Sequence, residues 1–275
     1  EKLIPEGVKR CSLGRFLAWL AFLGLFLLFG AIAAVTILYN GLGVTGLDNY
    51  FGFGLWITFD LAVIALGAGA FFTGFLKYII RIPKLQNIVN IAVIIGFLCY
   101  SGAMVILTLD IGQPARAWFG YWHPNVHSML TEVIFCITCY LIVLIIEFVP
   151  IILENRQLNK VRFLHHLAHN LHLYMPLFAG VGKFLSFFQQ GSLGGMYGVL
   201  FGRPFAFREG FFIWPWTFFL FVLSAIASGP AFTMLVTTFI EKLTGKKLVD
   251  FSVKALMGKI AGFLLCIYMF FKILD

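Results

Sequence analysis

Charged residues are scarce in this sequence, and that scarcity limits what the protein can be. Only 12% of the 275 residues are Asp, Glu, Lys or Arg, whereas 61% are hydrophobic, and the mean hydropathy is +0.95. A soluble globular domain carries about 25% charged residues. The composition therefore excludes such a protein and predicts a chain whose main solvent is lipid. Apolar runs recur along the whole length, so residues 1–275 are predicted to form a single transmembrane domain.

Motifs for nucleotide chemistry and for metal binding are also missing. There is no GxxxxGK[ST] loop, and the GSLGG segment at 191–195 is too short to serve as one. The five cysteines lie in or beside apolar segments, and the CxxC of Cys136 and Cys139 has no second ligand pair. We interpret the cysteines as small buried hydrophobic residues.

What the sequence does contain is a series of apolar runs, each long enough to cross about 30 Å of hydrocarbon. They predict an all-α, polytopic transmembrane bundle with seven spans: Phe16–Tyr39, Gly54–Leu76, Asn87–Leu109, Ser128–Ile152, Phe163–Phe188, Phe211–Ile240 and Lys254–Leu274. The first run follows basic residues but is too long for a signal peptide. The last run stops at Asp275 without a polar tail, so we expect the native chain to continue.

Lys and Arg residues gather on one side of these spans. That side holds the N-terminal segment and the loops near residues 77–84, 156–162 and 242–259. The positive-inside rule predicts a cytoplasmic N-terminus in a multi-pass protein of the cytoplasmic (inner) membrane. The net charge of +8 therefore reflects the basic loops that orient the chain in the membrane, and nucleic acid is not an expected partner.

The loops on the opposite side differ in composition from these basic connectors. They cover residues 40–53, 110–127 and 189–210 and are rich in glycine and aromatic residues. Because function concentrates in such loops, we expect the working face to be extracytoplasmic. Arginine forms bidentate bonds with carboxylates, so a docking role for a partner protein is predicted for Arg116, Arg203 and Arg208.

Ionisable side chains at membrane depth cost about 2.5–3.5 kcal/mol each on insertion scales, which makes them functional candidates. Four are predicted in the outer half of the spans: Asp60, Asp110, Glu132 and Lys183. Asp60 lies about 9 Å below the outer end by helix rise. The loop above them adds Tyr121, His123, Asn125 and His127. A proton-handling pocket is the preferred interpretation, and an Asp60–Lys183 ion pair that only joins two helices is the alternative.

A second polar group is predicted near the cytoplasmic side. Glu147 lies toward the inner end of the fourth span, and His165, His169 and His172 recur at helical spacing on the fifth. Haem ligation across a bundle needs a histidine on a second span, and the sequence supplies none. We therefore expect no haem here. The remaining interpretations are a proton path with Glu147 and an interfacial polar stripe.

Three stretches resemble a known family. They are residues 41–70, residues 109–150 with HPNVHSMLTEV and a closing EFVP, and residues 190–196 (QGSLGGM). They look like the NrfD/PsrC superfamily on its HybB-like branch, with DsrP-like relatives, over roughly residues 40 to 240. Two features depart from the pattern. Gln189 stands where such proteins often have a histidine, and the further C-terminal helices of HybB-like members are missing from this sequence.

The resemblance implies a membrane subunit of a respiratory oxidoreductase complex that exchanges electrons with a quinone, menaquinone, as its substrate. It also implies that the chain holds no haem or iron–sulfur cluster. The implied partners are an extracytoplasmic ferredoxin-like iron–sulfur subunit and a catalytic subunit such as a hydrogenase, a molybdopterin enzyme or a multihaem cytochrome.

On this interpretation the quinone head group lies beneath the outer loops, near Asp60, Asp110, Tyr121, His123, Asn125, His127 and Glu132. Protons come from the outer side or from the cytoplasm through Glu147, His169 and Lys183. One alternative is a secondary transporter or channel, which predicts helices broken at the midplane. A purely structural membrane anchor is the other alternative.

Overall fold

The computed structural model describes residues 12–48, 54–153, 161–198, 217–245 and 247–274. Within these ranges the chain is helical and contains no β-strand. The long helices are α1 (Leu13–Asn40), α2 (Leu55–Tyr78), α3 (Gln86–Asp110), α5 (Met129–Leu153), α6 (Arg162–Gly198), α7 (Thr217–Thr244) and α8 (Phe251–Leu274). The short elements are η1 (Leu42–Thr45), η2 (Pro83–Leu85), η3 (Pro114–Arg116) and α4 (Phe119–Trp122).

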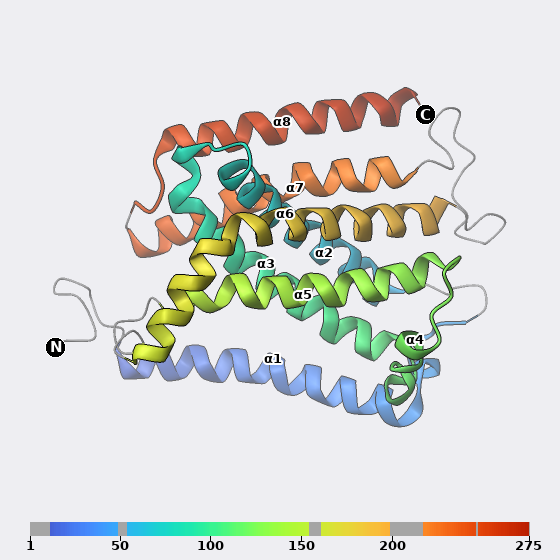
Figure 1. Cartoon of the computed structure of the whole chain (residues 1–275). Helices are drawn as coiled ribbons and strands as arrows, with labels where there is room; N and C mark the ends of the chain where they lie inside the picture. The colour runs from blue at the N-terminus through green and yellow to red at the C-terminus, as the bar shows by residue number, and fades with distance from the viewer. Residues whose placement is uncertain (1–11, 49–53, 154–160, 199–216, 246, 275) are drawn as a thin grey trace.

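Six of the long helices have the length and hydropathy of membrane spans, and α6 is a seventh if its two bent halves count as one. The predicted all-α transmembrane bundle is thereby confirmed. The long helices lie side by side, with α1 along one edge and α8 along the other (Figure 1). We call the end at which α1, α3, α6 and α8 begin the basic end. The end that carries α4 is called the outer end, after the orientation predicted from the sequence.

The helices pack as a bundle around two apolar cores. Helix α2 packs mainly on α3, and α5 on α6, while α7 contacts α2, α6 and α8. The central core joins α2, α3 and α5 through buried residues that include Ile64, Tyr100, Ile137 and Tyr140. The second core, at the basic end, connects α2 and α3 with the start of α8.

Helix α1 is the exception to this packing. Only 6% of its most apolar stretch is buried, and Ile37 alone is buried among residues 13–40, all of which the structure describes. Its surface is almost entirely apolar, as expected of a helix that faces lipid along most of its length. The buried interior of the bundle is therefore built mainly by the other helices.

Helix α6 extends ten residues beyond the predicted end at Phe188 and reaches Gly198. Residues 189–198 were expected in an outer loop because of their glycines, and that prediction was wrong. Glycine here serves close packing, since a Cβ added to Gly194 would lie 2.6 Å from the Phe218 Cα of α7. The helix also bends by 52° between His165–Leu171 and Leu173–Met196. Pro176 explains the bend, because it cannot donate a hydrogen bond to the carbonyl four residues earlier.

One carboxylate organises the loop between α7 and α8. Glu241 Oε1 accepts hydrogen bonds from the backbone N–H groups of Leu248 and Val249, each at 2.9 Å. Its other oxygen, Oε2, pairs with Lys254 Nζ near the start of α8. The side chain thus fixes the loop and the position of α8 together.

We expect Glu241→Ala to lower the melting temperature of the detergent-solubilised protein, because it removes all three of these contacts at once. The matched control is Lys247→Ala, which breaks the exposed Lys247–Asp250 pair in the same loop. Exposed ion pairs contribute little to stability. Equal melting temperatures for the two variants would contradict the organising role of Glu241.

Candidate functional site

Polar side chains face the interior of the bundle formed by α2, α3, α5 and α6. Those on α6 recur at intervals of three or four residues, which places them on one face of the helix. They are Lys183, Ser186, Gln189 and Gln190, each at most 3% exposed. The other three helices add Asp60 on α2, Tyr100 on α3, and Tyr140 and Glu147 on α5, each at most 5% exposed.

Several of these buried atoms have no hydrogen-bond partner in the part of the chain that the structure describes. They are Asp60 Oδ1, Asp110 Oδ1 and both amide atoms of Gln189. An unsatisfied buried polar group costs about 1–3 kcal/mol, and folded proteins retain few of them. Such a concentration is typical of a site whose donors and acceptors serve a polar ligand.

Two tyrosines connect these groups across the bundle. The rings of Tyr100 and Tyr140 meet edge to face, with centroids 4.1 Å apart. The Tyr100 hydroxyl lies beside Ser186 and Gln190, and Tyr140 lies close to Glu147. We call Gln190, Ser186, Tyr100, Tyr140 and Glu147 the interior polar series. It extends from the outer half of the bundle toward the basic end.

Asp60 and Asp110 form the acidic part of the site near the outer end. Asp60 is five residues into α2, about 7.5 Å along the helix axis from its start. Asp110 is the last residue of α3, and the two carboxylates are close enough to interact electrostatically. Neighbouring carboxylates in an apolar interior repel while both are charged, so binding one proton relieves the repulsion. The prediction that these two residues meet is consistent with this geometry.

Lys183 and Asp60 do not form the ion pair that the sequence analysis offered as an alternative to a proton-handling pocket. Its Nζ lies 4.0 Å from the ring centroid of Phe187 and 4.9 Å from that of Phe72. Phe72 follows Asp60 by twelve residues on α2, which is about 18 Å of helix rise. Because α6 continues to Gly198, Lys183 lies near the middle of the span, where cation–π contacts surround its ammonium group.

The loop before α5 is held by its own polar residues. The Tyr121 hydroxyl lies 2.7 Å from Thr138 Oγ1 of α5, and Asn125 Oδ1 accepts a hydrogen bond from the His127 N–H at 3.0 Å. The His123 ring stacks on Phe119 at 5.6 Å. The side chains of His123 and His127 are exposed, in contrast to the buried Asp60.

Glu132 lines a cavity that does not include Asp60. It lines an apolar cleft of about 1010 Å³ together with residues of α6, α7 and α8, among them Phe188, Ser192 and Phe218. The sequence predicted Glu132 beside Asp60 because both lie in the outer half of their spans. Their shared depth did not determine which way each side chain points around its helix.

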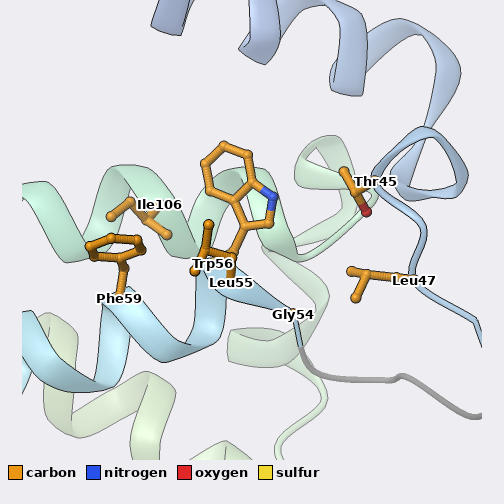
Figure 2. A pocket seen from close by; sticks show the side chains of 7 residues that line it. All are labelled: Thr45, Leu47, Gly54, Leu55, Trp56, Phe59 and Ile106. Atoms are coloured by element: carbon orange, nitrogen blue, oxygen red, sulfur yellow. The ribbon is translucent and has the colours of Figure 1, made fainter.

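The cavity nearer to Asp60 lies between α2, α3 and the segment after α1. It has a volume of about 520 Å³ and is lined by Thr45, Leu47, Gly54, Leu55, Trp56, Phe59 and Ile106. Figure 2 shows the Trp56 indole between Thr45 on one side and Phe59 and Ile106 on the other. Asp60 follows Trp56 by one helical turn. This apolar cavity is thus adjacent to the carboxylate pair.

The other predicted residues lie apart from the carboxylate pair. Glu147 is near Tyr78, whose hydroxyl accepts a hydrogen bond from Lys77 Nζ at 2.9 Å. His169 is exposed on the first, bent part of α6. Arg116 is exposed in η3, and Arg203 and Arg208 lie outside the described residues.

Sequence reasoning missed Tyr100, Tyr140, Ser186 and Gln190. Neutral polar residues are common in membrane helices, so each one alone carried no signal. The spacing of Lys183, Ser186 and Gln190 was a usable signal, since three polar residues recur on one face of an otherwise apolar helix. Gln189 stood out only as a departure from a family pattern.

The fold and the site define a polytopic α-helical membrane protein with a polar interior beneath its outer end. The chain belongs to the NrfD family, because the family model described as "Polysulphide reductase, NrfD" matches residues 43–275. The family resemblance inferred from the sequence is confirmed. The matched region contains the whole interior site and leaves α1 outside it.

Three relatives indicate the kinds of complex in which similar chains occur. The chain is 71% identical over 274 residues to "Menaquinone reductase, integral membrane subunit" of Nitratidesulfovibrio vulgaris, covering 100% of this chain and 65% of the relative. It is 23% identical to one of the subunits of a selenate reductase of Mesobacillus selenatarsenatis, covering 76% and 53%. It is 31% identical to "Probable Ni/Fe-hydrogenase 2 b-type cytochrome subunit" of Escherichia coli, covering 45% and 34%. The chain spans less than two thirds of the length of each of these curated relatives.

Proposed function

We propose that this chain is the quinone-reactive membrane subunit of a multi-subunit respiratory oxidoreductase and that its quinone is menaquinone. The observation that carries the proposal is the group of unsatisfied buried polar atoms inside the bundle, which includes one oxygen of each of two neighbouring carboxylates. The 71% identical relative supports the choice of quinone, because its name is menaquinone reductase.

The chemistry of quinones suits these side chains. Quinone reduction adds two electrons and two protons, so each carbonyl needs a hydrogen-bond donor and a route for a proton. Gln190 and Tyr100 offer N–H and O–H donors in the interior. Asp60 and Asp110 offer carboxylates that can pass a proton to or from the head group. The apolar cavity at Trp56 suits the ring or the first prenyl units.

The electrons would come from, or go to, an iron–sulfur partner that docks at the outer end. The α4 region presents exposed aromatic residues there, since Trp118, Phe119 and Trp122 are 51%, 46% and 75% exposed. Aromatic residues and arginine are enriched in protein interfaces, which supports a docking role for this region with Arg116. A ferredoxin-like subunit would link it to a hydrogenase, a molybdopterin enzyme or a multihaem cytochrome.

Protons can reach the site by two routes. The direct route leads from the outer end through Asp110 to Asp60. The second route follows the interior polar series from Glu147, through Tyr140 and Tyr100, to Gln190, with the buried Lys183 one turn from Ser186. The sequence predicted this route through Glu147, His169 and Lys183, and in the proposed route the interior polar series connects Glu147 with the head group. Transfer from the basic end would contribute to the membrane potential.

The test is quinone binding by a Gln190→Leu variant. Leucine keeps much of the buried volume and removes the amide, so we expect a menaquinone analogue to bind at least about tenfold more weakly to the purified complex, the loss of one to two hydrogen bonds. Ser192→Ala is the matched control, because Ser192 is buried on the same helix and its hydroxyl donates to a backbone carbonyl of that helix, Phe188 O. Tryptophan-fluorescence quenching by the quinone measures the affinity, and wild-type affinity for Gln190→Leu would count against this site.

A transporter and a structural anchor are the rival classes. A transporter predicts helices broken at the midplane in matching positions. The bend identified in α6 lies near its basic end, between Leu171 and Leu173. A structural anchor predicts no quinone binding at all. Absence of saturable quinone binding to the wild-type complex would therefore overturn the proposed function.

A further inference from the structure

An apolar groove runs along the seam between α7 and α8 at the basic end. Its volume is about 750 Å³, and its apolar lining includes Leu235, Phe239, Phe251 and Gly258. The groove reaches from Lys242 to Met234 along α7, which is about 12 Å of helix rise. Leu235, Phe239 and Phe251 are 63%, 60% and 79% exposed, so their apolar surface is open to the surroundings.

Two lysines lie at the mouth of this groove. Lys242 lines it from the last turn of α7, and Lys254 lines it from the first turn of α8. Lys254 is paired with Glu241, and the other oxygen of that carboxylate accepts the loop N–H groups. Lys242 has no acidic partner in the described part of the chain. The mouth therefore carries an excess positive charge directly beside an apolar channel.

We propose that this α7–α8 groove binds an anionic phospholipid, with its phosphate between Lys242 and Lys254 and an acyl chain along Phe239 and Gly258. The charge selects an anionic head group, and the length of the groove accommodates the upper part of an acyl chain. Basic pockets between transmembrane helices at the positively charged face are known to favour anionic lipids. The site lies at the opposite end of the bundle from Asp60 and does not depend on the proposed quinone reaction.

The first experiment compares charge variants of the purified complex after delipidation. Phosphatidylglycerol is titrated, and bound lipid is counted by native mass spectrometry. Lys242→Gln should weaken binding about fivefold, since a lysine near an anionic lipid contributes on the order of 1 kcal/mol. Lys259→Gln, an exposed lysine on α8 outside the groove, should leave binding close to the wild type. Equal effects of the two substitutions, or equally tight binding of phosphatidylethanolamine, would overturn the proposal.

The second experiment tests the groove itself. Gly258→Leu places a side chain in the channel, where a Cβ meets only Met234 Sδ at 3.8 Å, and it should displace the lipid. Gly262→Leu, one turn further on α8 with open space around it, is the control and should retain it. A photoreactive phenylalanine analogue at position 239 in native membranes should then yield adducts of phospholipid mass. Adducts to a protein segment instead would show that another helix covers the groove, and would overturn the proposal.

Discussion

Replacing Gly229 or Gly69 by alanine is expected to prevent the bundle from assembling. The two glycines lie at the crossing of α7 and α2, and a Cβ added to either would overlap the backbone of the other. Close approach of backbones through small residues is a main source of helix association in membranes. Overpacking typically costs about 1–3 kcal/mol, and the cost should reach or exceed that range here, because backbone atoms on both sides cannot move aside.

The measurement is the yield of monodisperse protein in detergent, followed by its melting temperature. Gly74→Ala is the matched control, since Gly74 is buried on the same helix as Gly69 but has open space where a Cβ would go. We expect Gly74→Ala to behave like the wild type and Gly69→Ala to be lost to aggregation. Normal yield and melting temperature for both crossing-point variants would mean that α2 and α7 do not meet in this way.

The second large effect is expected from Asp60→Asn, which should lower quinone turnover by the assembled complex about a hundredfold or more, because general acid–base groups typically contribute 10²- to 10⁴-fold to a rate. Asparagine keeps the size of the side chain and removes its ability to exchange a proton. The buried position of Asp60, beside Asp110 and one turn from the Trp56 cavity, is what gives this residue the role.

Glu132→Gln is the informative comparison for Asp60→Asn. Glu132 lines the separate cleft between α5, α6, α7 and α8, and its substitution should leave turnover within a few fold of the wild type. Steady-state oxidation or reduction of a soluble quinone measures turnover, and co-purification of the other subunits verifies assembly. A slow Glu132→Gln and a normal Asp60→Asn would move the reaction site to that cleft.

A Glu147→Gln variant separates the two proton routes when the complex is placed in vesicles. If protons come along the interior polar series, loss of the Glu147 carboxyl should abolish the membrane potential formed during turnover. If they come through Asp110, the reaction is electroneutral and the potential is already absent in the wild type. These outcomes test only the route of the protons. The position of the quinone site is tested by comparing Asp60→Asn with Glu132→Gln.

The sequence by itself determined the class of this protein. Apolar runs are local properties of the chain, so the number of spans and most of their boundaries followed from hydropathy, because each run must satisfy its backbone hydrogen bonds within one helix. The cost of a carboxylate at membrane depth identified Asp60 as a buried functional candidate, and the structure buries it. The motifs at residues 41–70 and 123–133 indicated the NrfD family.

Only the tertiary structure decided which polar groups meet. Helices in lipid can be apolar on every side, so the sequence pattern of α5 does not reveal which of its faces points inward, and the polar face of α6 does not reveal which groups it meets. For that reason depth alone grouped Asp60, Lys183 and Glu132 in one predicted pocket, with an Asp60–Lys183 ion pair as the alternative. The structure places Lys183 against Phe72 and Phe187 and Glu132 in a separate cleft. The end of α6 was likewise decided by packing, since Gly194 allows α7 to approach closely and the chain stays helical where its composition suggested a loop.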